Sequence, residues 1–170
     1  MTAHLCQCRP LLNLCRLFSL SLTLVKHRQI SASIDVKELL VRATDQSNKK
    51  QEQTLIFLTY TTWPMDDTIP SDTQSFLSFA HLAHSYQVTD TPLLIHCNTG
   101  VGRSGCTLLI SLLLIKMTRG RTLDVFAMAK ECRRQRCGFI QTPQQYRFVY
   151  ECLRDALNMA IEHSIMQSAQ

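Results

Sequence analysis

The chain has 170 residues, of which 45% are hydrophobic and 18% are charged. This length and composition favour one globular domain with a buried core and exclude a chain that is disordered throughout. The net charge is +5, and most of the 18 basic residues are Arg, whose planar guanidinium suits bidentate capture of oxyanions.

The first 30 residues differ in character from the rest of the chain. They are rich in Leu and contain three of the eight Cys residues. Their longest apolar stretch, residues 17–25, is too short to span a bilayer. It has the length of a secretory signal core, but polar and charged residues separate it from the small residues at 31–33 that a cleavage site would need. We therefore expect a divergent, poorly ordered leader at residues 1–30, a cytoplasmic location and no membrane association.

Two strands, a helix and a third strand are expected after this leader. Residues 34–44 and 54–62 are rich in β-branched and aromatic residues, and the polar stretch between them fits a hairpin loop. Asp72 then fits the N-cap of a helix that runs to about Tyr86 and carries its apolar residues on one face. The apolar run at 92–96 is bounded by turn signals, as a fully buried strand would be.

Three helices are expected in the C-terminal part. Residues 104–117 are apolar nearly all round, which is typical of a helix buried at the centre of a fold. Thr122 fits the N-cap of a second helix that ends near Gly138. Thr142 fits the N-cap of the last helix, where Gln145 would complete a capping box. The expected apolar stripe of that helix consists of Tyr146, Val149, Tyr150, Leu153, Leu157, Ala160 and Ile161.

The loop between the buried strand and the buried helix has the sequence HCNTGVGRSG, residues 96–105. A strand, a tight Gly-containing loop and a helix N-terminus together form a ready site for an anion. The backbone N–H groups of residues 98–103 can all point inward, because two Gly residues permit the dihedral angles that this requires. The expected phosphate-binding residues are Asn98, Thr99, Gly100, Val101, Gly102 and Arg103.

Cys97 lies inside this anion site and is the candidate nucleophile. The N–H dipoles, the helix terminus and the Arg103 guanidinium all favour the thiolate and so lower the pKa of the thiol. Arg103 can grip two phosphate oxygens at once, and Ser104 can donate a hydrogen bond to the sulfur and help it leave. Cys97 is thus expected to be a nucleophile within its own oxyanion site.

The spacing separates this interpretation from the alternative of a buried structural Cys beside a turn. A Cys six positions before an Arg is expected by chance roughly half a time in a chain of this composition, and the two Gly residues lower that expectation to about 5 in 10,000. The other Cys and His residues show no zinc-like spacing, so we expect no metal and no other cofactor.

The charge of this part of the chain agrees with an anionic substrate. Residues 97–154 hold ten Lys and Arg residues against three Asp and Glu residues. Nucleic acid and acidic membranes are the other partners that a basic surface favours. We expect no nucleic-acid partner, because aromatic residues are not interleaved with the basic ones. The basic run at 133–136, taken alone, is interpreted as a solvated face.

The HCNTGVGRSG loop resembles the signature of the Cys-dependent protein tyrosine phosphatases, with His96 as a supporting residue. The segment YTTWPMDD, residues 60–67, resembles the family's mobile acid loop, with Trp63 as a supporting residue. The segment QTPQQYRF, residues 141–148, resembles its glutamine loop and the helix that follows. The three motifs stand in the family's order and favour its classical, tyrosine-specific branch.

The resemblance implies an α/β fold: a partial protein-tyrosine-phosphatase fold with a mixed twisted sheet and C-terminal helices packed on it. The catalytic domain would occupy residues 31–164, followed by a tail at 165–170. The implied reaction is hydrolysis of phosphotyrosine in a partner protein. Cys97 attacks phosphorus and forms a phosphocysteine, an Asp protonates the leaving phenol oxygen, and that Asp then activates a water positioned by Gln141 and Gln145.

The acid loop departs from the family pattern. The family's acid directly follows the Pro of the loop, but here Met65 follows Pro64. Pro70 stands one residue later than the family's second Pro, which indicates a one-residue insertion and puts Asp66 in the place of the acid. Two alternatives stay open: Asp67 is the acid, or Met65 replaces the acid outright.

The N-terminal region is the second departure. Only 62 residues precede Trp63, and none of them matches the family's phosphotyrosine recognition loop. The sheet would then lack strands, and the pocket one wall. Three functions stay open: a protein tyrosine phosphatase, a catalytically impaired relative that binds phosphotyrosine or a partner phosphatase, and a redox-responsive thiol protein, because a thiol of low pKa oxidises readily.

Overall fold

The structure is a computed structural model that describes residues 3–7, 17–45, 47–65, 69–87 and 92–168. Its sheet has five strands in the order β2-β3-β4-β1-β5, and every described pair of neighbours is antiparallel. The predicted α/β fold with C-terminal helices is thus confirmed. The strands are β1 Ala3–Gln7, β2 Leu17–Ser31, β3 Ile34–Asp45, β4 Lys50–Tyr60 and β5 Leu93–His96.

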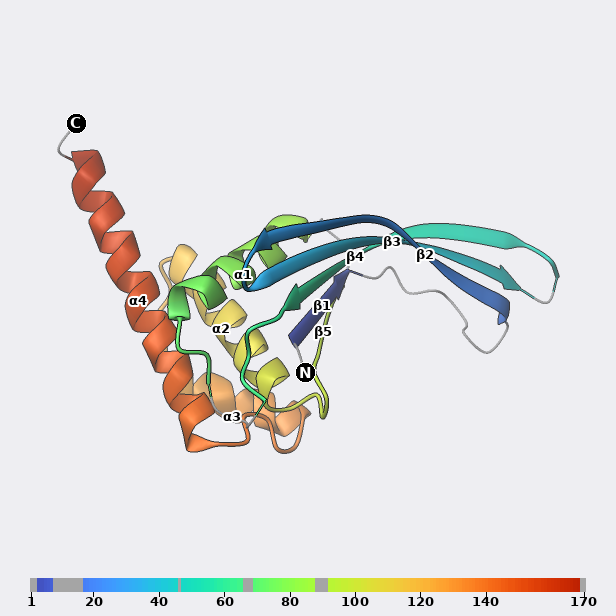
Figure 1. Ribbon diagram of the computed structural model, residues 1–170. Coiled ribbons are helices and arrows are strands. Elements are labelled where there is room, and N and C mark those ends of the chain that lie inside the picture. The colour runs from blue at the N-terminus through green and yellow to red at the C-terminus, as the bar shows by residue number, and fades with distance from the viewer. Residues whose placement is uncertain (1–2, 8–16, 46, 66–68, 88–91, 169–170) are drawn as a thin grey trace.

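The strands β2, β3 and β4 form a long antiparallel arm that leaves the body of the molecule (Figure 1). The predicted hairpin between β3 and β4 is confirmed, with longer strands and a shorter loop than the sequence indicated. Only the body end of the arm is part of the main core, where Ile34 and Val36 of β3 pack beside Leu58 and Tyr60 of β4.

The described residues of the predicted leader form two strands. β1 lies between β4 and β5, and β2 pairs with β3 along most of its length. Pairing with a neighbouring strand satisfies backbone groups of residues 3–7 and 17–31. The poor order of the leader and the division of the chain at residue 30 stay predictions.

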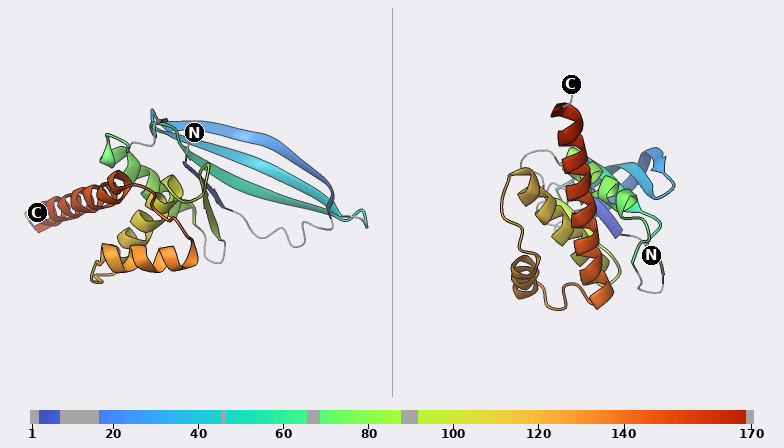
Figure 2. Two further views of the ribbon diagram at one scale, coloured as in Figure 1. Left: turned by 90° about the horizontal axis from the view of Figure 1, so that it is seen from below. Right: turned by 90° about the vertical axis from the view of Figure 1, so that its left-hand side faces the viewer.

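Four helices pack on the body end of the sheet, and the arm points away from them (Figures 1 and 2). α2 lies against β1 and β5, and its residues Leu109, Ile110 and Leu113 are fully buried, as expected for a central helix. None of the described helices has the length and apolar character needed to cross a membrane. The helices are α1 Thr73–Tyr86, α2 Arg103–Thr118, α3 Val125–Gln135 and α4 Pro143–Ser168.

The helix starts follow the expected capping chemistry with one correction. The Asp72 side chain accepts hydrogen bonds from the first turn of α1, as predicted. α3 starts later than expected and is capped by Asp124, whose Oδ1 accepts from Ala127 N at 2.8 Å. The prediction that Thr122 is the N-cap of α3 was wrong. Thr122 and Asp124 are both residue types that cap helices, and the Asp124 carboxylate is the acceptor that the helix uses.

The start of α4 confirms Thr142 as N-cap, since its Oγ1 accepts from Gln145 N at 3.2 Å. The capping box is not completed as predicted. Gln145 Oε1 accepts from the backbone N–H of Gln141 instead, at 2.9 Å, which turns this side chain toward the glutamine loop. The buried residues of α4 are Gln145, Phe148, Val149, Cys152, Leu153 and Ala156.

Two predictions of burial were wrong. Leu157 and Ile161 of α4 are exposed, because the second half of this helix extends beyond the body (Figure 1), and Tyr150 in its first half is 47% exposed. β5 is not fully buried either, since Leu94 is 53% exposed. β5 is an edge strand with one described neighbour, so its outer edge is not covered by another described strand.

An aromatic cluster connects the acid loop to the core. Trp63 packs edge-to-face on Phe76 of α1 and on Phe148 of α4, with ring centroids 5.6 and 5.7 Å apart. All three rings are buried, and Tyr60 at the end of β4 packs on the same group. Edge-to-face packing of this kind stabilises a single arrangement, so the start of the acid loop is fixed.

Phe148→Ala is expected to lower the free energy of unfolding by about 3–5 kcal/mol, because it leaves a cavity in the aromatic cluster. Phe126→Ala is the matched control, since this helical Phe is 68% exposed. The control should change stability by no more than about 0.5 kcal/mol. Urea unfolding followed by circular dichroism measures both, and equal losses would contradict the placement of Phe148 in the core.

Candidate active site

The phosphate loop joins β5 to α2, as the sequence predicts. Cys97 directly follows β5, and Arg103 is the first residue of α2. Gly100 has a φ of +73°, a left-handed conformation that suits Gly. The turn brings Gly100 N to 3.3 Å from the Cys97 sulfur, to which it donates a hydrogen bond. The N–H groups at the start of a buried helix therefore lie beside the candidate nucleophile.

The pKa of the Cys97 thiol lies below its ordinary value. Burial alone would raise that pKa, but polar groups around the sulfur outweigh it. They are the Ser104 hydroxyl and the backbone N–H groups of Ser104, Gly100 and Thr99. Each of them favours the thiolate over the thiol. The direction agrees with the prediction from the sequence.

The Ser104 hydroxyl lies near the sulfur without ideal hydrogen-bond geometry. Its Oγ atom is buried and completes no hydrogen bond to any group in the described part of the chain, yet it stands close enough to lower the pKa of Cys97. Its closeness to the sulfur is sufficient for this effect, because a hydroxyl proton rotates to follow an acceptor. A buried hydroxyl without a competing partner is available to the sulfur.

Arg103 links the phosphate loop to the acid loop. This residue is 7% exposed, and its Nη2 donates a hydrogen bond to the backbone oxygen of Pro64 at 3.0 Å. Trp63 before that Pro is held by the aromatic cluster, while Met65 after it is exposed and lines the cavity around the sulfur. The two loops are thus attached to one another through one guanidinium.

The two candidate acids, Asp66 and Asp67, lie outside the described residues. Asp66 follows Met65 in the chain, and consecutive Cα atoms are about 3.8 Å apart. The acid loop therefore continues from a residue that itself forms part of the cavity wall.

Gln141 and Gln145 reach the same cavity from the C-terminal side. Gln145 is only 2% exposed. Both side-chain amides lie against Gly102, where a Cβ would stand 2.7 Å from Gln141 Oε1 and 3.0 Å from Gln145 Nε2. A residue without a side chain is therefore required at position 102 for the two amides to lie beside the phosphate loop.

These side chains enclose a cavity of about 260 Å³, lined by Met65, Cys97, Asn98, Thr99, Arg103, Gln141 and Gln145. The structure thus brings together most of the site residues that the sequence predicts. A thiol of lowered pKa, a guanidinium and several backbone N–H groups in one small cavity can hold an oxyanion beside a nucleophile.

His96 takes a place behind the phosphate loop rather than in this cavity. It lies on β5 with its ring 6.1 Å from that of Phe57. It lines a separate hollow of about 380 Å³, whose other walls include Gly100 and Ser104. His96 can therefore support the loop from the rear but does not reach the cavity around the sulfur.

Two arginines of the basic run at 133–136 are exposed, as a solvated face predicts, and also hold the loops. Arg133 Nε and Nη2 donate to the backbone oxygens of Phe139 and Ile140 at 2.8 and 2.9 Å. Arg136 Nη2 donates to the backbone oxygen of Thr99 at 3.3 Å. These contacts were missed because the partners are backbone carbonyl groups, which leave no pattern in the spacing of charged residues.

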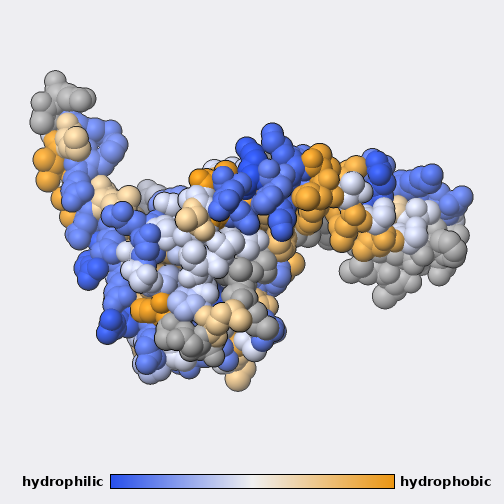
Figure 3. Space-filling view, in the orientation of Figure 1, coloured by the Kyte–Doolittle hydropathy of each residue, from blue (hydrophilic) through white to orange (hydrophobic). Residues whose placement is uncertain are grey.

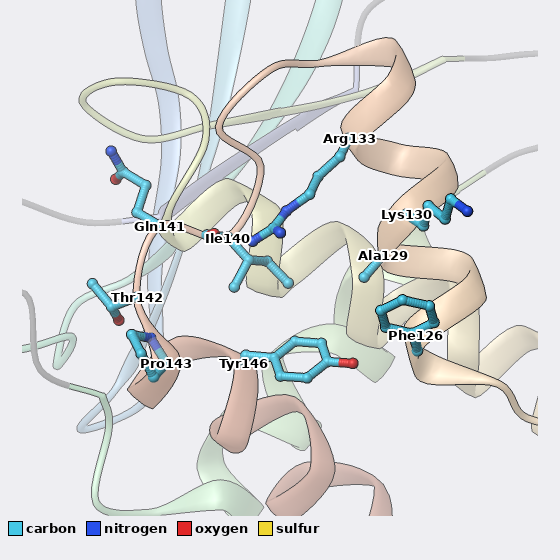
Figure 4. Close-up of a pocket in the computed structure, with 9 residues that line it drawn as sticks. All are labelled: Phe126, Ala129, Lys130, Arg133, Ile140, Gln141, Thr142, Pro143 and Tyr146. Atoms are coloured by element: carbon cyan, nitrogen blue, oxygen red, sulfur yellow. Dashed lines mark hydrogen bonds between the residues drawn. The ribbon is translucent and has the colours of Figure 1, made fainter.

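A larger cavity of about 700 Å³ lies beside the site, between α3 and the start of α4 (Figure 4). The rings of Phe126 and Tyr146 lie on its two sides, and Gln141 stands at its edge with its side chain pointing away (Figure 4). A hydrogen bond with Tyr150 raises the pKa of Tyr146 to about 12, so this phenol stays neutral. The described residues that line this cavity include no Cys, and it is not the candidate active site.

Comparison with known proteins identifies the family to which the chain belongs. A family model for protein-tyrosine phosphatase matches residues 14–155. The chain belongs to the protein-tyrosine phosphatase family. Non-receptor type 20 of Mus musculus is 30% identical over 125 residues, which cover 74% of this phosphatase chain and 28% of that protein. Non-receptor type 2 of Rattus norvegicus is 37% identical over 106 residues, which cover 61% of the chain and 25% of that protein.

The fold of this phosphatase chain also matches a solved catalytic domain. The crystal structure of human protein tyrosine phosphatase non-receptor type 18 aligns with a TM-score of 0.72 at 26% identity. The alignment covers 81% of this chain and 48% of that one. The phosphatase chain thus spans about half of the solved domain and a smaller share of the curated relatives that it matches.

Near neutral pH, Cys97 is expected to react with iodoacetamide faster than the thiols of Cys106 and Cys152, whose pKa values burial raises. Loss of the hydroxyl in Ser104→Ala should raise the pKa of Cys97 and move its alkylation profile to higher pH. Ser111→Ala, a buried serine farther along α2, is the matched control. Peptide mass spectrometry after timed alkylation measures each profile, and an unshifted profile in Ser104→Ala would exclude a role for that hydroxyl.

Proposed function

We propose that this chain hydrolyses phosphotyrosine in proteins through a phosphocysteine intermediate. The observation that carries the proposal is the position of the Cys97 thiol, whose pKa is lowered, in one small cavity with Arg103. A thiolate is a strong nucleophile, and the same donors that stabilise it can receive the three outer oxygens of a phosphoryl group. The family of the chain supports the same reaction.

In the first step the Cys97 sulfur attacks phosphorus while the bond from phosphorus to the phenol oxygen breaks. The phosphoryl group moves to sulfur, and the leaving phenolate takes a proton from a general acid. In the second step a water attacks phosphorus, the deprotonated acid removes a proton from that water, and the thiolate leaves as inorganic phosphate forms. Ser104 is well placed to donate to the leaving sulfur, since its hydroxyl lies beside it.

The loop residues and glutamines have distinct roles in this proposal. The backbone N–H groups of residues 98–103 bind the phosphoryl oxygens together with the Arg103 guanidinium. Gln141 and Gln145 orient the water of the second step, which is supported by their position in the wall of the cavity. No cofactor takes part in these steps.

Asp66 is proposed as the general acid. The hydrogen bond from Arg103 to Pro64 holds the acid loop against the phosphate loop, and Met65 lines the cavity. The residue that follows is Asp66. The same observation favours one second candidate: if the Met65 side chain occupies the place of the acid, the chain binds phosphotyrosine, or a partner phosphatase, without efficient turnover. We place either activity in the cytoplasm.

Cys97→Ser is expected to abolish hydrolysis of p-nitrophenyl phosphate while phosphate or vanadate binding persists, because the N–H groups and Arg103 remain. Arg103→Lys should also lose turnover, since an ammonium group cannot hold two oxygens in the way that a guanidinium does. Release of p-nitrophenol and isothermal titration with vanadate measure the two properties. Turnover near that of the parent in Cys97→Ser would exclude the phosphocysteine mechanism.

Asp66→Ala is expected to lower the rate by about 10²–10⁴ for an aryl phosphate whose leaving group has a high pKa, because that group needs a proton. The effect should be much smaller for a leaving group of low pKa. Asp67→Ala is the matched control and should change little with either ester. Initial rates across leaving groups measure the difference. If Asp66→Ala matches the parent and Asp67→Ala loses rate, Asp67 is the acid; if neither variant loses rate, this chain is assigned to the phosphate-binding alternative.

A further inference from the structure

The strand β2 forms one edge of the sheet and extends along the arm. It contains 15 residues and pairs with β3 on one side, and no other described strand pairs with it. Its outer edge therefore presents backbone N–H and C=O groups that can pair with a further strand. The arm leaves the body of the molecule, so the helices do not cover this edge (Figures 1 and 2).

The side chains of this edge are apolar and exposed. Leu20, Leu22 and Leu24 are 49%, 61% and 55% exposed. They alternate along the strand and so share one face of the sheet, opposite Ala43, Val41 and Leu39 of β3. Hydrophobic surface is visible over the arm in Figure 3.

The edge also lacks the features that keep edge strands apart. Residues 19–25 contain no charged residue and no Pro, although charge and Pro are common protections of an exposed edge. The charged residues of β2 follow this segment, at Lys26 and Arg28. An uncharged exposed edge of this kind is suited to contact with another strand.

The sequence of this segment is complementary to itself. Residues 20–24 read Leu-Ser-Leu-Thr-Leu, so the order of apolar and hydroxyl residues is the same in both directions. We propose that two copies of the chain associate through residues 19–25 of β2, paired antiparallel about a two-fold axis at Leu22. Leu22 then faces its own copy, Leu20 faces Leu24, and Ser21 faces Thr23.

Charge selects the antiparallel arrangement over a parallel one. In a parallel pair in register, Lys26 would face Lys26 and Arg28 would face Arg28, which is unfavourable. In the antiparallel pair Lys26 and Arg28 of one copy lie at the opposite end of the interface from Lys26 and Arg28 of the other copy. The two apolar faces also become continuous, because each Leu lies beside Leu residues of the other copy.

The proposed contact is closed rather than open-ended. Both copies use the same edge, so the pairing satisfies both strands and leaves neither free for a third copy. The opposite edge of the sheet is β5, which has four residues and offers far less backbone. An interface of seven residues a side is small compared with permanent dimer interfaces, so we expect a dimer that dissociates on dilution.

Sedimentation velocity of the whole chain over a dilution series tests the proposal. The parent should pass from dimer to monomer as it is diluted. Leu22→Lys places two like charges on the two-fold axis and should weaken association at least tenfold. Leu94→Lys is the matched control, because this Leu is 53% exposed on the other edge strand, and it should dimerise like the parent. Circular dichroism shows whether each variant keeps the fold.

Hydrogen exchange of the unmodified chain gives a second measurement that does not depend on a variant. Amides of residues 19–25 should exchange more slowly in the concentrated sample than in the dilute one, while those of β4 should not change. Cys97→Ser should behave like the parent in both experiments, which keeps this result independent of the proposed catalysis. A monomer at every concentration, open-ended growth, or equal weakening by Leu22→Lys and Leu94→Lys would overturn the proposal.

Discussion

The backbone of Ile140 lies so close to the first turn of α2 that position 105 has no room for a side chain, since a Cβ there would stand 2.9 Å from Ile140 N. Ile140 N donates to the backbone oxygen of Val101 at 3.0 Å, and Ile140 itself has a φ of +59°, which costs a β-branched residue about 1–3 kcal/mol. The hydrogen bonds from Arg133 to this segment come from a charged donor and contribute about 1.5–3 kcal/mol each, so they can outweigh that strain. The position of both glutamines depends on this contact.

The opposite wall of the site depends on apolar packing. Trp63 is fixed by Phe76 and Phe148, which come from helices far apart in the chain, and the acid loop starts from that ring. The core therefore positions one loop and backbone hydrogen bonds position the other. Both loops meet α2, whose buried apolar residues hold its N-terminus in the body of the molecule. Such support from rigid elements is what a site built on loops requires.

Local patterns in the sequence were sufficient for much of this arrangement. The all-round apolar character of α2, the Asp72 cap and the loop around Cys97 each depend on neighbours within a few residues, and the structure agrees with them. Contacts between distant segments were not accessible in this way. The hydrogen bond from Arg136 to the backbone oxygen of Thr99 and the pairing of β2 with β3 depend on tertiary structure, which composition does not encode. The exposed end of α4 was missed for the same reason, since periodicity shows an apolar face and not what covers it.

The hydrogen bond between Arg103 and Pro64 makes the two loops thermodynamically dependent on one another. The guanidinium has five N–H donors, and the one given to the carbonyl oxygen fixes the plane in which the others are offered to an anion. An anion whose oxygens accept hydrogen bonds from the donors in this plane therefore stabilises the present position of the acid loop. By reciprocity, the loop in this position raises the affinity for the anion by the same factor. Binding of an anion in the cavity and the position of the acid loop are thus coupled equilibria.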